Sequence, residues 1–79
     1  MKIPRDLSGL DLIKSLCRDW GYQRMHQVGS HVVLETENPS HHRLAIPDHR
    51  NLRVGTLNNI LRAVAKHKNV TREDILNTF

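Results

Sequence analysis

The chain has 79 residues, of which 38% are hydrophobic and 25% charged, so it fits one small soluble domain over residues 1–79 and not a disordered tail. No apolar run exceeds three residues, whereas a transmembrane helix needs about 20 and a signal peptide about 7 to 15, so we expect a cytoplasmic protein with no membrane partner. Twelve Lys and Arg against eight Asp and Glu give a net charge of +4, which favours a phosphate-rich partner and a merely basic surface equally.

The first predicted element is a helix over residues 9–20. Ser8 and Asp11 have the spacing of a capping box, with Asp in place of the usual Glu. The apolar residues recur at helical spacing and form one stripe: Leu12, Ile13, Leu16, Cys17 and Trp20. Gly21 follows, where a left-handed cap is expected. The single cysteine belongs to this buried stripe and agrees with a reducing compartment.

Three short strands are predicted next, over residues 22–28, 31–36 and 42–47. The turn signals Gly29-Ser30 and Asn38-Pro39-Ser40 separate them. Connections this short exclude parallel pairing, which needs long crossovers, so the strands are antiparallel.

Period-two alternation assigns the strand residues to two faces. Four apolar residues face the core: Val32, Leu34, Leu44 and Ile46. The residues between them point away from the helices: His31, Val33 and Glu35. Pro47 has no N–H to donate and is expected to end the third strand.

A polar loop over residues 48–54 leads to a second helix, which begins at Gly55-Thr56 and fades at residues 67–69. Thr71 and Asp74 form another capping-box pattern before a short third helix. The order α-β-β-β-α(-α) predicts an α+β fold, with one three-stranded antiparallel sheet and the helices packed on one face. The predicted core contains Leu12, Ile13, Leu16, Trp20, Val32, Leu34, Leu44, Ile46, Leu57, Ile60, Leu61 and Val64.

The sequence lacks the phosphate-binding glycine loops, the nucleophile elbow and the zinc motifs of common enzymes. Five histidines could contribute to a metal site: His26, His31, His41, His42 and His49. Structural zinc sites usually combine paired ligands at fixed spacing with cysteine, and the tandem His41-His42 would point to opposite faces of a strand. We therefore predict no metal and no other cofactor.

His31 is the candidate for catalysis. It starts a strand directly after a Gly-Ser turn, on the face that core side chains do not occupy. An exposed imidazole there can accept or donate a proton and can reach a phosphodiester. RNA supplies its own nucleophile in the 2′-hydroxyl, so cleavage needs only a proton acceptor or donor and cations around the phosphate. From spacing alone, a solvated strand-end histidine is the favoured alternative.

Four short motifs then occur in a consistent order: Ile3-Pro4-Arg5-Asp6-Leu7-Ser8-Gly9, Gly29-Ser30-His31, Ala45-Ile46-Pro47-Asp48-His49 and Gly55-Thr56-Leu57-Asn58-Asn59-Ile60-Leu61. Together with Tyr22 after Gly21, they resemble the HicA family of small messenger-RNA-cleaving toxins from bacterial and archaeal toxin–antitoxin pairs. One departure concerns the residues before Gly29, because Gln27 and Val28 stand where many members carry a basic residue.

The resemblance implies a fold like the double-stranded RNA-binding domain and a ribosome-independent endoribonuclease activity. It implies that His31 is the catalytic histidine of the Gly-Ser-His motif. It also implies a HicB antitoxin partner, encoded next door, that covers the active surface.

Further candidate residues surround this assignment. The candidate RNA-phosphate contacts are Arg24, Ser30, Arg43, Arg50 and Arg53, each with a solvating surface residue as the alternative. Glu35 could orient His31, and His49 could lie near the site as an auxiliary residue. Two other functions stay open: a domain of the same fold that binds RNA without cutting it, and a module whose basic face docks an acidic protein.

Overall fold

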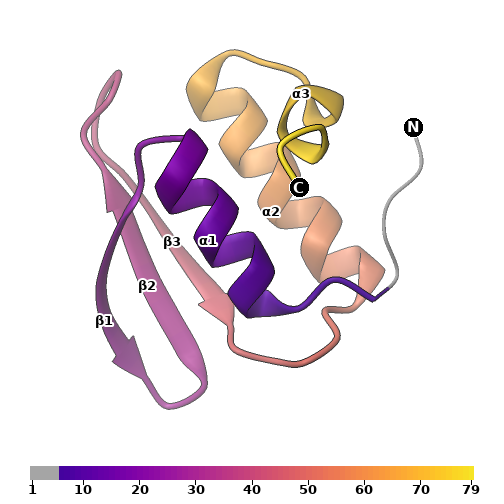
Figure 1. Ribbon diagram of the computed structural model, residues 1–79. Helices are drawn as coiled ribbons and strands as arrows, with labels where there is room; N and C mark the ends of the chain where they lie inside the picture. The colour runs from indigo at the N-terminus through magenta and orange to yellow at the C-terminus, as the bar shows by residue number, and fades with distance from the viewer. Residues whose placement is uncertain (1–5) are drawn as a thin grey trace.

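The computed structural model describes residues 6–79, so Ile3-Pro4-Arg5 of the opening motif lies outside the described residues. The elements follow the predicted order (Figure 1): α1 (Gly9–Asp19), β1 (Gln23–Val28), β2 (His31–Thr36), β3 (His42–Pro47), α2 (Val54–Lys68) and α3 (Arg72–Leu76). A helix, three antiparallel strands and two further helices confirm the α+β fold. Among residues 6–79, no helix combines the length and the apolar character that crossing a membrane requires.

The caps of α1 form as the sequence predicts. The N–H of Asp11 donates to Ser8 Oγ at 3.0 Å, and the N–H of Ser8 donates to the Asp11 carboxylate at 3.4 Å. Gly21 follows the helix with φ +72°, a left-handed conformation in which a β-carbon is unfavourable. The second capping box also forms, between Thr71 and Asp74 at the start of α3.

The central strand of the sheet is β2, with β1 and β3 at its two edges. Val32 pairs with Ile46, and Leu34 pairs with Leu44, so the predicted register of the core face is confirmed. The strand β3 ends at Pro47, as expected from its missing N–H.

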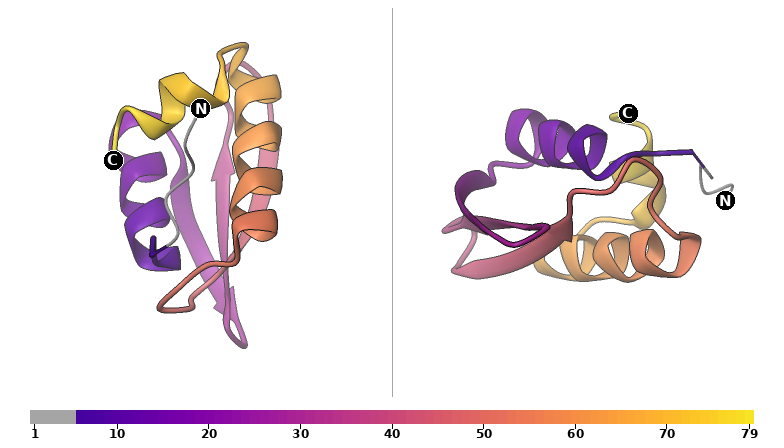
Figure 2. Two further views of the ribbon diagram at one scale, coloured as in Figure 1. Left: turned by 90° about the vertical axis from the view of Figure 1, so that its right-hand side faces the viewer. Right: turned by 90° about the horizontal axis from the view of Figure 1, so that it is seen from below.

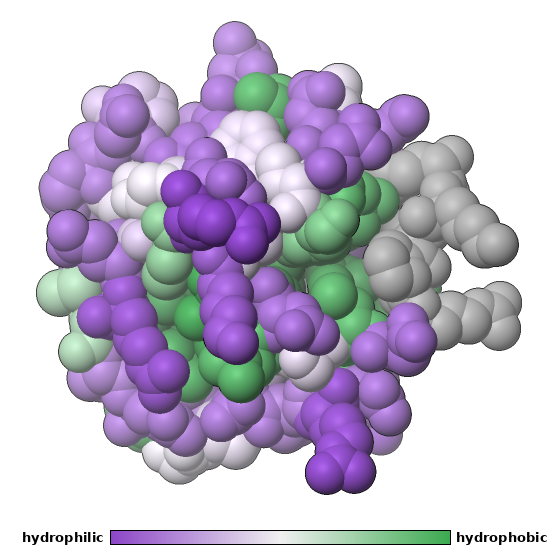
Figure 3. All heavy atoms as spheres, viewed as in Figure 1, coloured by the Kyte–Doolittle hydropathy of each residue, from purple (hydrophilic) through white to green (hydrophobic). Residues whose placement is uncertain are grey.

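Both long helices pack on one face of this sheet. Figures 1 and 2 show α1 and α2 lying side by side over it, with α3 against α2, and they show the opposite face of the sheet without a helix. The amphipathic stripe of each helix explains this arrangement, because each has one apolar side to bury. In Figure 3, hydrophilic residues cover most of the helix-bearing side, and hydrophobic ones show mainly in the middle of the view.

The core matches the predicted set except at Trp20, which is only partly buried. Trp20 caps the end of α1, and its indole N–H donates to Thr78 Oγ1 at 3.2 Å near the surface. Four buried core residues were not in the predicted set: Tyr22, Leu52, Ala65 and Ile75.

Two features shape the helix-free face of the sheet. Val33 lies on it and is still only 4% exposed, because it sits in the central strand between its partners His26 and Ala45. A β-bulge between Arg24 and His26 leaves Met25 without a partner in β2. The bulge changes the alternation along β1, so residues before and after it do not keep one common parity.

Candidate functional site

His31 occupies the first position of β2, directly after the turn formed by Gly29 and Ser30. Gly29 has φ +59°, which lets the chain reverse within two residues. His31 is exposed and pairs with Val28 on one side and Pro47 on the other. Its parity with Val33 puts it on the helix-free face. The predicted position of His31 is therefore the observed one.

The end of β3 is fastened to this turn and to the start of α1. The N–H of Asp48 donates to the carbonyl of Ser30 at 2.7 Å, and the N–H of Gly9 donates to the carbonyl of His49 at 2.9 Å. The backbone at Gly9 approaches Pro47 so closely that a β-carbon would lie 1.9 Å from the Pro47 carbonyl oxygen. These contacts hold the loop after β3 beside the hairpin that carries His31.

A cavity of about 350 Å³ opens where this loop enters α2. It is lined by Pro47, His49, Asn51, Leu52, Arg53 and Thr56. Arg53 caps α2 through its backbone only, and the first turn of α2 carries no acidic side chain. His49, Arg50 and Arg53 are all exposed, so the cationic groups of this loop face solvent.

Five of the candidate residues thus gather at one end of the sheet: Ser30, His31, His49, Arg50 and Arg53. The arrangement combines the exposed imidazole of His31 with a loop that carries two exposed arginines, and the backbone of Asp48 joins this loop to the turn before His31. An imidazole can transfer a proton, and guanidinium groups can bind phosphate oxygens.

Arg24, Arg43 and Glu35 lie elsewhere. Arg24 pairs with Leu34, a core residue, and donates to Gln27 Oε1 at 3.1 Å, so the bulge has turned it toward the helix side of the sheet. Glu35 and Arg43 pair with each other on the same face as His31. Glu35 is four residues from His31 along β2, which is about 13 Å and beyond hydrogen-bond reach.

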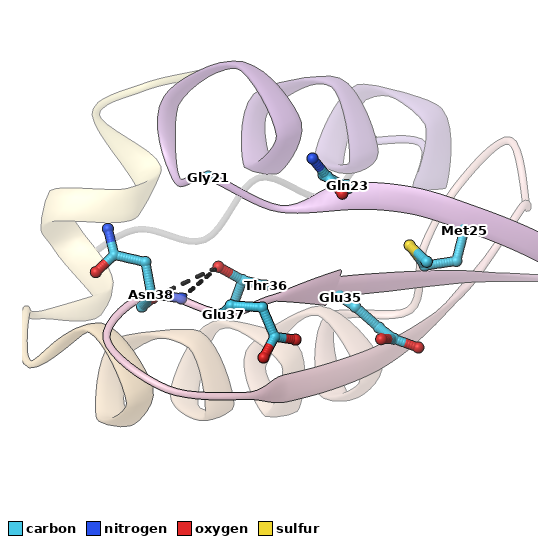
Figure 4. A pocket seen from close by; sticks show the side chains of 7 residues that line it. All are labelled: Gly21, Gln23, Met25, Glu35, Thr36, Glu37 and Asn38. Carbon is cyan, nitrogen blue, oxygen red and sulfur yellow. Dashed lines mark hydrogen bonds between the residues drawn. The ribbon is translucent and has the colours of Figure 1, made fainter.

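Glu35 instead belongs to a cluster with Glu37 and His41, whose ligand-type atoms lie within 4.8 Å of one another. The imidazole of His41 donates to the Glu37 carboxylate at 2.6 Å, and this hydrogen bond raises the pKa of His41. A cavity of about 280 Å³ adjoins the cluster (Figure 4), and in this view both carboxylates point away from β1. Arg43 Nε stands 4.0 Å from Glu35 and supplies a competing positive charge. The cluster has the donor types for a divalent cation, but its exposed groups already pair with one another.

A pair of stacked histidines lies on the helix side of the sheet, and the sequence pattern did not predict it. His42 stacks on His67 of α2 with ring centroids 4.4 Å apart, and its Nδ1 shares a hydrogen bond of 2.8 Å with the Tyr22 hydroxyl. The N–H of His67 donates to the Ser40 carbonyl at 2.9 Å. His41 and His42 therefore point to different partners, as expected for a tandem pair in extended chain.

The environment of this histidine pair changes three pKa values. Burial, followed by the charges of His67 and Lys68, lowers the pKa of His42. Burial raises the pKa of Tyr22 to about 12. Burial also lowers the pKa of Lys68, whose ammonium lies 5.0 Å from the Tyr22 ring centroid. On α1, burial raises the pKa of the Cys17 thiol, which agrees with its place in the packed stripe of the helix.

The comparison with known families identifies one match. The family described as the HicA toxin of bacterial toxin–antitoxin systems matches residues 9–65, which include α1, the whole sheet and most of α2. No curated protein and no solved structure matches the chain.

Proposed function

Because the chain belongs to the HicA toxin family of bacterial toxin–antitoxin systems, we propose that it is a ribosome-independent endoribonuclease that cleaves messenger RNA in the cytoplasm. His31 is its catalytic residue, and the reaction uses no metal and no other cofactor. The observation that carries this proposal is the exposed imidazole of His31 beside the basic loop after β3, joined to it by the Asp48–Ser30 hydrogen bond.

The chemistry follows from what RNA already contains. The 2′-hydroxyl next to the scissile phosphate attacks phosphorus once a base accepts its proton, and an imidazole is suited to this transfer near neutral pH. The fragments would then carry a 2′,3′-cyclic phosphate and a 5′-hydroxyl. His31 fits this role because strand parity places it on the face of the sheet opposite α1 and α2, where it is exposed and an RNA strand has access.

Cationic side chains would hold the phosphate backbone. Arg50 and Arg53 lie in the loop that adjoins His31, and Ser30 precedes it in the turn, so these three are the contacts closest to the scissile phosphate. Arg43 is on the same face farther along the sheet and would contact a neighbouring phosphate. Arg24, turned toward the helix side at the edge strand, could meet only RNA that wraps around β1.

Membership of a toxin–antitoxin family implies an antitoxin partner. We propose that it is a HicB-type protein whose acidic surface covers the helix-free face of the sheet. A surface that binds phosphate is already complementary to carboxylates, which steer and orient an inhibitor. Co-expression of the neighbouring open reading frame should restore growth, and a folded protein that is harmless when expressed alone would contradict the toxin role.

The second candidate function is RNA binding without cleavage, favoured by the same fold and charge. Incubation of the purified protein with RNA in a chelator separates the two functions. The ribonuclease predicts fragments, whereas intact RNA with salt-dependent binding would favour the binding domain. An absence of RNA binding at low salt would leave only a protein-docking role for the basic face.

A further inference from the structure

His49 is held next to the hairpin that carries His31. The N–H of Asp48 donates to the carbonyl of Ser30 at 2.7 Å, so antiparallel pairing extends one residue beyond the His31–Pro47 pair. His49 is the next residue along the chain. In an antiparallel ladder, a residue two positions from a direct partner is a diagonal neighbour about 7 to 8 Å away. His49 stands two positions beyond Pro47, at the start of the loop and one residue past the last paired position.

The surroundings of His49 suit a reacting phosphodiester. The carbonyl of His49 accepts a hydrogen bond from the N–H of Gly9 at 2.9 Å, which ties this part of the loop to the start of α1. The His49 side chain is exposed and borders the cavity of about 350 Å³ together with Pro47 and Arg53. Pro47, which pairs with His31 in the sheet, also lines this cavity. The charged neighbours of His49 in this loop are Asp48, Arg50 and Arg53.

His26 is a diagonal neighbour of His31 within the ladder, through Val28 on β1. His26 is exposed on the same face as His31. It does not line the cavity of about 350 Å³ that Arg53 and His49 border. The cavity that Arg53 lines therefore adjoins His49 and not His26. This difference selects His49.

We propose that His49 is a second catalytic residue, the general acid that protonates the leaving 5′-oxygen. The proposal rests on the ribonuclease function and on His31 as the base. The 2′-oxygen forms a bond to phosphorus and its proton passes to His31, while the bond between phosphorus and the 5′-oxygen breaks. Both electrons of that bond go to the 5′-oxygen, which takes a proton from His49. Exchange with water then restores both imidazoles.

The test is a short RNA in which sulfur replaces the bridging 5′-oxygen at one position. A thiol has a pKa of about 8.5, far below that of an alcohol, so a thiolate leaves without a general acid. We expect His49→Ala to cleave the ordinary bond about 10² to 10⁴-fold more slowly and the sulfur-containing bond within about tenfold of the wild-type rate. His31→Ala should be slow on both bonds. His49→Gln, which keeps a polar side chain of similar size, should behave as His49→Ala.

The matched control is His26→Ala, which we expect to cleave both bonds at about the wild-type rate. Equal losses by His49→Ala on the two bonds, or no loss on the ordinary bond, would overturn the role of His49 and leave the ribonuclease function in place. If His26→Ala, and not His49→Ala, cleaved the ordinary bond slowly and the sulfur-containing bond at about the wild-type rate, the general acid would be His26. A wild-type protein that cleaves neither bond would overturn the ribonuclease function itself.

Discussion

The α-carbon of Gly9 lies so close to Pro47 that a β-carbon added at position 9 would stand 1.9 Å from the Pro47 carbonyl oxygen. Neither side of this contact can yield easily, since both are backbone. Gly9 opens α1, and Pro47 closes β3 opposite His31. The contact therefore joins the first helix to the strand end that borders the candidate site.

Gly9→Ala should lower the free energy of unfolding by about 1 to 3 kcal/mol, the usual cost of forcing extra volume into a packed site. Urea unfolding followed by circular dichroism measures the change. Gly55→Ala is the matched control, because Gly55 also lies in the first turn of a helix and a β-carbon there meets nothing within 4 Å. Gly55→Ala should be neutral or stabilising by up to about 1 kcal/mol. If Gly9→Ala were as stable as Gly55→Ala, the close contact would be wrong.

The two adjacent histidines should affect stability with opposite pH dependence. The pKa of His42 is lowered in the folded protein, so the unfolded chain binds the proton more readily, and stability is lost as the pH falls from about 6.5 through the folded pKa. His42→Gln should therefore lose less stability than the wild type between pH 7.5 and pH 5.5. Urea unfolding at the two pH values gives both free energies.

His41 should change stability with pH in the opposite direction to His42. Its hydrogen bond with Glu37 raises its pKa, so its stabilisation is present below pH 6.5 and is lost as the pH rises through the folded pKa. His41→Gln should then lose more stability than the wild type on acidification, although the effect is small at an exposed position. Changes of the same sign in the two variants would contradict the assigned environments.

Tyr22, the only tyrosine in the chain, should ionise late. Burial raises its pKa to about 12, so the phenol absorbance change should occur well above pH 10 in the folded protein and near pH 10 in urea. Because the folded pKa is the higher one, stability should be constant below pH 10 and should fall as the pH rises toward 12. A folded-state midpoint at pH 10 would mean that the ring is solvated.

Local signals in the sequence were sufficient for most of the fold. The capping boxes at Ser8 and Thr71 depend on residues three positions apart, and the register of Val32 and Leu34 depends on simple alternation. Such features are local, so tertiary packing did not need to be known. The position of His31 follows from the same alternation and from its place after the Gly29 turn.

The unpredicted features depend on packing between distant segments. A one-residue bulge places Arg24 on the helix side of the sheet, opposite Leu34. The sequence of β1 gives no clear signal for such a bulge. Glu35 shares a face with His31, and its four-residue spacing alone already sets the two about 13 Å apart. Its contacts with Arg43 and His41 needed the assembled sheet. The contact of His42 with Tyr22 joins residues 20 positions apart, so it needed the assembled sheet.

The most direct test of the account compares the wild type with His31→Ala on one RNA in the presence of a chelator. We expect wild-type fragments that end in a 2′,3′-cyclic phosphate and a 5′-hydroxyl, and cleavage slowed by about 10² to 10⁴-fold in His31→Ala. RNA binding should change little because it depends on several cationic contacts, and stability should change by less than about 0.5 kcal/mol at this exposed position. Fragments with 5′-phosphate ends, or a folded His31→Ala protein that cleaves at the wild-type rate, would contradict it.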